Sequence, residues 1–183
     1  MKKILLLAGC LAVLSMVSAQ DIWFTRTGKI DFHAGTSVED IDGTNNEVAS
    51  MVNIKTGELV FNVLVKSFHF KRALMEEHFN ENYMESNQFP KASYKGKIIN
   101  LPAVNPASDG QYAIQTEGEL TMHGVTRPVK ASGKLVVQKG KISTQSTFKI
   151  LLADYGIKVP SVVADKISKE VTIIVNCLYD PKS

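Results

Sequence analysis

Hydrophobic and polar residues alternate along much of the chain, which is typical of strands that pack one face against a core. The clearest example is the segment ELVFNVLVK. One face of that strand carries Leu59, Phe61, Val63 and Val65. The same pattern predicts further strands at residues 28–35, 48–55, 92–100, 112–122, 125–138, 142–152 and 170–178. Eight or so antiparallel strands at short spacing predict an all-β fold, either a sandwich or an up-and-down barrel.

Short runs rich in Gly, Asn and Asp separate these strands and predict turns at residues 42–46, 56–57, 109–110 and 139–140. The run LTMHGVTRPV predicts a further hairpin, because His123 and Gly124 both tolerate the positive φ of a tight turn. Pro128 cannot donate a ladder hydrogen bond, so it should lie at a bulge or an edge. His123 and Arg127 then either brace the turn or anchor an anionic group, and we favour bracing.

One segment breaks the strand pattern. Residues 68–83 (FHFKRALMEEHFNENY) contain no Gly or Pro and are rich in helix-forming residues. They predict a short helical insert that ends before Phe89-Pro90. Such an insert either plugs one end of a barrel or forms the lid or wall of an apolar cavity.

The N-terminus has the pattern of a secretory signal. Two lysines precede an apolar run, and small residues ending at Ala19 offer a cleavage site. The run is shorter than the roughly 20 residues that a membrane-spanning helix needs. We therefore expect a signal peptide at residues 1–19 and one domain at residues 20–183, periplasmic or secreted. In the rival interpretation, Leu7-Ala8-Gly9-Cys10 is a lipobox that places a lipid on Cys10.

Charge and cysteine content narrow the function classes. The formal net charge is +3, and two of the lysines lie in the predicted signal, so the mature chain is near +1. Nucleic-acid binding usually needs a clustered basic face, which this sequence does not offer. Without the signal, Cys177 is the remaining cysteine, which excludes an intramolecular disulfide. Its position on the apolar face of a strand predicts a buried, inert thiol.

The sequence offers no catalytic or metal-binding constellation. The four histidines lack the i, i+4 spacing of a helical zinc site, and no HExxH, GxSxG or phosphate-cradling Gly-rich motif is present. Glu76 and Glu77 are adjacent, so they point to different faces of a helix and do not form a carboxylate pair. The prediction is a protein without catalytic activity, metal or cofactor.

Several motifs together resemble the YceI-like family, also called the polyisoprenoid-binding family. The run LTMHGVTRPV at residues 120–129 resembles the family signature LTxHGVTxPV. FNENYMESNQFP at residues 79–90, with Ala-Ser-Tyr at 92–94, is similar to the stretch that leads into the family's F/YPxAxF/Y strand. TFKI at residues 147–150 and DYGI at 154–157 resemble its INRxDFGI segment. The resemblance covers essentially the whole mature chain.

The chain departs from the family pattern in two places. Leu151-Leu152-Ala153 replaces the usual Asn-Arg-Ser, and residues 71–78 differ from the family's RDxHLxS run. These departures do not change the predicted fold. They bear instead on the identity of the ligand and on the contacts to its head group.

The resemblance implies an extended lipocalin-like antiparallel β-barrel that holds a long isoprenoid lipid, such as a polyprenyl phosphate or an isoprenoid quinone, along its axis. A barrel of eight strands is about wide enough for one such ligand. Contact with a membrane would be transient, and the oligomeric state is left open. The alternative function is a structural or stress-related interaction protein whose barrel is filled by its own side chains. An unrecognised hydrolase is a more distant third.

Strand alternation and the insert supply the candidate ligand-binding residues, each of which is equally compatible with an ordinary core. The apolar candidates are Leu59, Phe61, Val63, Val65, Phe68, Phe70, Leu74, Phe79, Tyr94, Ile98, Phe148, Ile150, Ile173 and Val175. The cationic candidates for a head group are Lys71, Arg72, His78 and Arg127.

Overall fold

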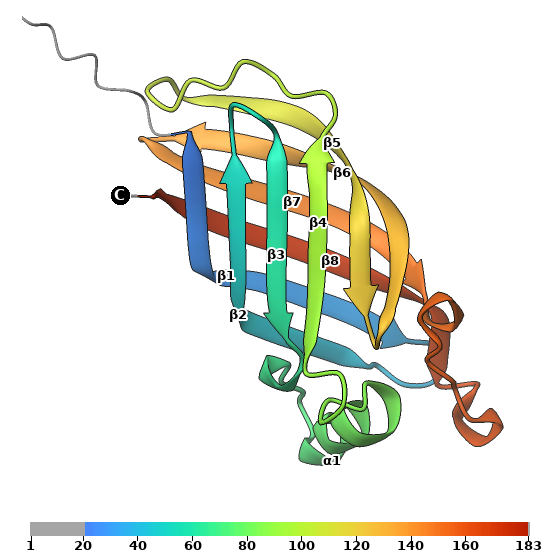
Figure 1. Cartoon of the computed structure of the whole chain (residues 1–183). Helices are drawn as coiled ribbons and strands as arrows, with labels where there is room; N and C mark the ends of the chain where they lie inside the picture. The colour runs from blue at the N-terminus through green and yellow to red at the C-terminus, as the bar shows by residue number, and fades with distance from the viewer. Residues whose placement is uncertain (1–20, 183) are drawn as a thin grey trace, which may run out of the picture.

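The structure, a computed structural model, describes residues 21–182, so the predicted signal peptide and Cys10 lie outside the described residues. The described chain forms a closed barrel in which eight antiparallel strands follow one another in sequence order (Figure 1). The strands are β1 (Ile22–Gly35), β2 (Asp42–Asn53), β3 (Glu58–Leu64), β4 (Lys91–Ile98), β5 (Gly110–Met122), β6 (Val125–Gln138), β7 (Lys141–Leu151) and β8 (Ile167–Pro181). The predicted all-β barrel is confirmed, with the up-and-down order of lipocalins, and the sandwich is excluded.

Short helical segments gather at one end of the barrel (Figure 1). They are η1 (Val65–Ser67), α1 (Ala73–His78), the π-helix η2 (Phe79–Tyr83), η3 (Leu152–Tyr155) and η4 (Ser161–Val163). The predicted helical insert therefore exists, but it begins later than residue 68. His69 forms an isolated bridge with Thr44, through N–H···O bonds of 3.0 and 2.8 Å, and this pairing holds the start of the insert extended.

Two tight turns agree with the sequence. His123 and Gly124 have φ values of 51° and 73°, and Lys139 and Gly140 have 51° and 71°. In each hairpin these two residues alone separate the last strand pair, which is the geometry of a two-residue turn with both φ positive.

The turn predicted at residues 42–46 is wrong, because these residues open β2. Asn45 is fully buried, and its side-chain amide donates a hydrogen bond of 3.0 Å to the Leu64 carbonyl. The Thr44 hydroxyl donates to Asp31 at 2.7 Å. Asn and Thr favour turns when they bond to their own backbone, and Asn45 Oδ1 does accept such a bond from the Glu47 N–H at 2.8 Å. Here, however, both side chains also bond to neighbouring strands, which keeps these residues within β2.

Pro128 lies at an exposed edge, as the sequence predicts. β6 pairs with β7 only over Gly133–Gln138 in the described ladder, so its first half pairs with β5 alone. Pro128 is in that first half, opposite Glu119. A proline followed closely by Lys130 is a common protection of such an edge against pairing with another chain.

The end of the barrel near the C-terminus is filled with side chains. Trp23, Leu135, Ile142 and Tyr179 are buried there in one cluster. The Tyr179 hydroxyl lies 2.9 Å from the Ser50 hydroxyl, so this polar group is satisfied inside the core. The free volume of the barrel therefore lies toward α1.

Cys177 belongs to this packed end, and burial raises the pKa of its thiol to about 11. In a Cys10→Ser variant, we expect the folded protein not to react with Ellman's reagent at pH 8, because roughly one thousandth of the thiol is ionised. Since the unfolded thiol ionises near pH 9 and the folded one near 11, stability should also fall as pH rises through this window. Rapid labelling of the folded protein, against full labelling in urea as the control, would contradict the burial.

Candidate ligand-binding cavity

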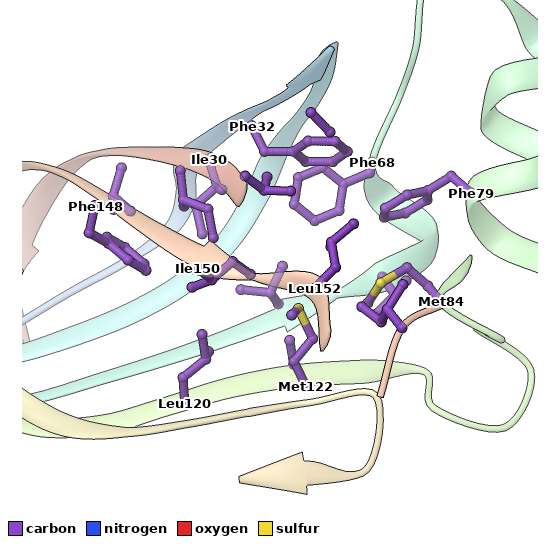
Figure 2. A pocket seen from close by; sticks show the side chains of 18 of the residues that line it. Ile30, Phe32, Phe68, Phe79, Met84, Leu120, Met122, Phe148, Ile150 and Leu152 are labelled. Carbon is purple, nitrogen blue, oxygen red and sulfur yellow. The ribbon is translucent and has the colours of Figure 1, made fainter. Parts of the chain in front are cut away.

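An apolar cavity of about 570 Å³ occupies the half of the barrel toward α1. Its volume is in the range of pockets that enclose small organic ligands. Figure 2 shows side chains pointing into it from opposite walls, with Phe32, Phe68 and Phe79 on one side and Leu120 and Met122 facing them. This half of the barrel is not filled by the protein's own side chains.

The structure brings nearly all of the predicted apolar residues to this cavity. The predicted residues that line it are Leu59, Phe61, Val63, Val65, Phe68, Phe70, Leu74, Phe79, Tyr94, Phe148, Ile150, Ile173 and Val175. Ile98 does not line it and is instead buried in the packed end with Trp23. Leu64, on the opposite face of β3, is 47% exposed, so the chosen face of that strand points inward. Contact of these residues with a ligand stays a prediction.

The helical insert forms part of the cavity wall. Phe32 of β1 lies at the centre of an aromatic cluster, with its ring centroid 5.3 Å from Phe68, 5.7 Å from Phe70 and 5.5 Å from Phe79. Aromatic pairs at these separations stabilise beyond their buried area. The cluster therefore holds the insert against β1. The insert lies beside the cavity as part of its wall and does not plug it.

Several lining residues were missed by the sequence analysis. They include Ile30, Phe32, Met84, Leu120, Met122 and Ile157. The signal for Leu120 and Met122 was present, because both lie on one face of the predicted hairpin strand. Met84 and Ile157 lie in irregular segments, where alternation gives no guidance.

A pair of glycines makes room for the Tyr94 ring on the inner face of the sheet. Gly96 of β4 pairs with Gly118 of β5. A Cβ built on Gly96 would lie 2.4 Å from the Tyr94 hydroxyl oxygen, and one on Gly118 would lie 2.7 Å from its ring. The ring therefore covers both glycines, and burial raises the pKa of Tyr94. With Thr116 and Thr144, Tyr94 gives the inner part of the cavity a few hydroxyl groups.

The mouth of the cavity carries its charged groups. Of the four cationic candidates, Arg72 and His78 line the cavity, whereas Lys71 and Arg127 do not. Arg127 donates through Nε to the Asp154 carbonyl at 3.0 Å and so braces the segment after β7. Glu39 and Lys166, both missed, also line the mouth. They come from distant loops, and no sequence pattern indicates that such residues meet.

His123 braces the mouth from the β5–β6 turn, as favoured from the sequence. Its Nδ1 lies 2.9 Å from the Tyr155 carbonyl oxygen and its Nε2 lies 2.9 Å from a Glu85 carboxylate oxygen. The ring also packs against Phe89 at a centroid distance of 4.8 Å. One side chain thus ties the hairpin to the segments before β4 and after β7.

Replacing His123 with alanine should lower the free energy of unfolding by about 1–3 kcal/mol, measured by urea denaturation, because the braced groups lose their partner. His123→Asn is the matched variant, since asparagine tolerates the positive φ of the turn but lacks the ring. If the asparagine variant were as stable as the wild type, the turn geometry rather than the brace would be what matters.

These features suit the binding of a long apolar molecule with a polar group at the mouth, because burial in the cavity removes apolar surface from water. Residues 21–182 contain no group of three or more His, Cys, Asp or Glu side chains that could hold a metal ion. Within the same range, no helix combines the length and the hydropathy needed to cross a membrane.

The barrel fold is shared with known structures. The chain is similar to a polyisoprenoid binding domain from Saccharophagus degradans implicated in plant cell wall breakdown, with a TM-score of 0.76 and 13% identity over 90% of this chain and 100% of that chain. BcnA from Burkholderia cenocepacia gives a TM-score of 0.64 and 12% identity over 84% of this chain and 96% of that chain. A YceI protein from Campylobacter jejuni gives a TM-score of 0.62 and 12% identity over 81% of this chain and 89% of that chain. At these identities the likeness shows the fold alone.

The sequence itself carries the family relationship. No curated protein matches the chain. The family model of the YceI-like domain, however, matches residues 24–178, which include every strand from near the start of β1 to near the end of β8. The chain therefore belongs to the YceI-like domain family.

Proposed function

We propose that this protein is an exported, non-enzymatic carrier or store for one isoprenoid lipid, held in the barrel cavity. The observation that carries the proposal is the apolar cavity itself, about 570 Å³ in volume and open at a charged mouth. Membership of the YceI-like family supports it, as does the description of the S. degradans structure as a polyisoprenoid binding domain. The ligand class includes polyprenyl phosphates and isoprenoid quinones.

The physical reason for such a carrier is the poor solubility of an isoprenoid chain. Each CH₂ group moved out of water stabilises the complex by roughly 0.8 kcal/mol, so an apolar sleeve lets the chain cross an aqueous compartment. Net affinity falls well below the sum of these contributions, because a flexible chain loses entropy when it is ordered.

Export to the periplasm or medium is part of the proposal and is supported by the signal pattern of residues 1–19. Processing near Ala19 gives a free protein that contacts membranes transiently, and lipidation at Cys10 is the rival route. Mass spectrometry of the N-terminus of exported protein separates the two. A mature chain that begins at Gln20 supports cleavage, and a diacylglycerol adduct on Cys10 overturns it.

The alternative of a barrel filled by its own side chains, acting through its surface, is disfavoured by the open cavity. The decisive experiment is organic extraction of the purified exported protein, followed by mass spectrometry of the extract. A prenyl lipid at about one molecule per chain is expected, and its mass identifies the ligand. If the extract stays empty after incubation of the protein with host membranes, the carrier function is wrong.

A further inference from the structure

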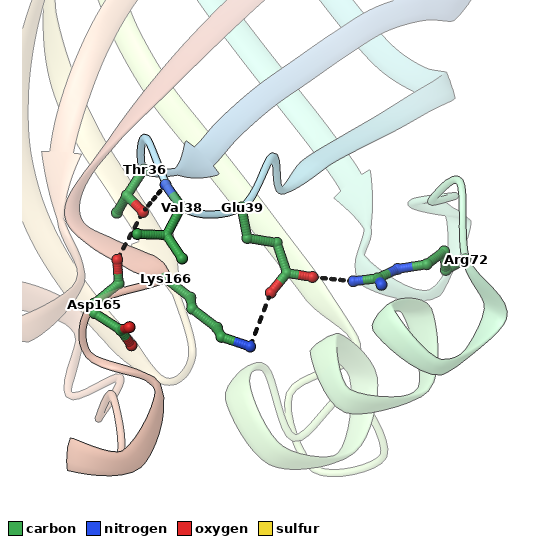
Figure 3. A network of polar contacts seen from close by, with 6 residues as sticks. All are labelled: Thr36, Val38, Glu39, Arg72, Asp165 and Lys166. Atoms are coloured by element: carbon green, nitrogen blue, oxygen red, sulfur yellow. Dashed lines mark hydrogen bonds and ion pairs between the residues drawn. The ribbon is translucent and has the colours of Figure 1, made fainter.

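Three segments that are far apart in the sequence meet at the mouth through one carboxylate (Figure 3). Glu39, on the loop between β1 and β2, accepts a hydrogen bond from the Arg72 guanidinium, just before α1. The other Glu39 oxygen lies 3.6 Å from Lys166 Nζ, just before β8. Thr36, on the same loop as Glu39, donates to the Asp165 carbonyl at 2.7 Å, which keeps the loop beside Lys166.

Positive charge is in excess at this position. Among the described residues, Glu39 is the one acidic side chain in the cavity lining, and it faces two cations. Its side chain is 24% exposed, compared with 62% for Arg72 and 45% for Lys166, so Glu39 is the least exposed of the three, and its carboxylate lies between the two cationic groups (Figure 3). The Arg72 hydrogen bond is the main cause that lowers the pKa of Glu39, which therefore stays ionised at neutral pH.

The position of the cluster relates it to a bound chain. Arg72, Lys166 and Glu39 all line the cavity whose remaining walls are almost entirely apolar. An amphiphile that buries its chain in the barrel would leave its polar end among these three side chains. Two cations at one anion are a common arrangement for recognition of phosphate or carboxylate groups, and arginine offers two donors at once.

We propose that Arg72 and Lys166 form a two-cation site for the acidic end group of the bound lipid, and that Glu39 fills this site when no lipid is present. The inference rests on the proposed function and specifies its ligand class as a long apolar chain with an anionic oxygen group. Binding exchanges one anion for another, and Glu39 turns toward solvent on its loop. Because the cluster is near the surface, breaking these ion pairs costs little.

The experiment compares geranylgeranyl phosphate with geranylgeraniol, which shares the chain but lacks the charge. Displacement of a fluorescent apolar probe from the purified mature protein gives both affinities. The wild type should bind the phosphate about tenfold more tightly, and this preference should shrink in high salt. Arg72→Gln and Lys166→Gln should each weaken binding of the phosphate about three- to tenfold and leave the alcohol unchanged.

Glu39→Gln is the most informative variant, because it removes the resident carboxylate without changing its shape. Binding of the phosphate should strengthen at least about threefold, with binding of the alcohol unchanged. Lys158→Gln, at an exposed lysine outside the cavity lining, is the control and should alter neither affinity. Inorganic phosphate at millimolar concentration should not displace the prenyl phosphate, since the chain supplies most of the affinity.

The outcomes separate the end-group site from the carrier function. If Glu39→Gln shifts both lipids equally, the cluster is a mechanical clasp of the mouth and the two-cation site is wrong, while the carrier function stands. Equal affinity of the wild type for the two lipids overturns the site in the same way. Displacement by inorganic phosphate would make it a free-anion site instead. If neither lipid binds the folded wild type, the carrier function fails and the end-group site fails with it.

Discussion

Replacing Ala131 with phenylalanine should weaken binding of the proposed lipid and leave the fold intact. Ala131 lines the cavity from the half of β6 that pairs with β5 alone, on the same face as the buried Leu135. A phenyl ring there would occupy the cavity space proposed for the ligand chain. Forcing the chain to share that space costs about 1–3 kcal/mol, which corresponds to roughly 5- to 150-fold in affinity. Probe displacement by a prenyl lipid measures the loss.

The neighbouring residue provides the matched control. Ser132 is exposed and alternates with Ala131 on β6, so Ser132→Phe adds the same ring outside the barrel. This variant should bind lipid as the wild type does. Thermal unfolding of the Ala131→Phe variant should show a transition close to that of the wild type. If both variants bound lipid normally, the cavity would not be the binding site.

The largest loss of stability is expected for Gly118→Ala. A Cβ at this position would lie 2.4 Å from the Lys95 carbonyl oxygen and 2.5 Å from the Gly96 Cα. Both neighbours belong to the backbone of β4, so relief requires the strands to move apart and the Tyr94 ring to shift. We expect the free energy of unfolding to fall by about 3 kcal/mol or more, measured by urea denaturation.

Gly110→Ala serves as the control for this substitution. The atom nearest to a Cβ at Gly110 is the Tyr112 hydroxyl oxygen at 3.0 Å, at the far end of a side chain that can turn away. The free energy of unfolding of the Gly110→Ala variant should change by less than about 1 kcal/mol. A Gly118→Ala variant as stable as Gly110→Ala would show that the two strands are not tightly apposed at the glycine pair.

The strands could be predicted because each has one buried face, which imposes a period of two on the sequence. Leu59 and Val63 of β3 are buried and alternate with Leu64, which is exposed, and this contrast is visible in the sequence alone. The turn at His123 and Gly124 could be predicted because its backbone conformation restricts the residue types. Asn45 could not be placed, because its burial depends on the Leu64 carbonyl of another strand.

The candidate site likewise has one part that could be predicted from the sequence and one part that could not. Its apolar wall follows from alternation, so Phe61 and Phe148 reach the cavity as predicted. Its charged mouth is made of loops, where side chains have no periodic position. Arg72 was a candidate because it belongs to the insert, but its partner Glu39 lies on a separate loop. Lys166 meets Glu39 through the β1–β8 pairing that closes the barrel. Ile98 shows the limit of alternation. The pattern predicts that a side chain points into the barrel, but not whether it lies at the cavity or in the packed end.

The closure of the barrel also fixes the order in which the chain can fold. Seven of the eight strand pairs in the barrel join strands that follow one another in sequence. The eighth pairs β1 with β8, so it forms only once β8, which begins at Ile167, is available. Hairpins can form locally while the chain is being made, but joining the two ends closes a loop that spans nearly the whole domain and is slow for that reason. A nascent chain that lacks its last strand exposes β1 and β7 as unpaired edges, and such edges promote aggregation. The C-terminal strand is therefore the segment on which the folding yield of this protein depends.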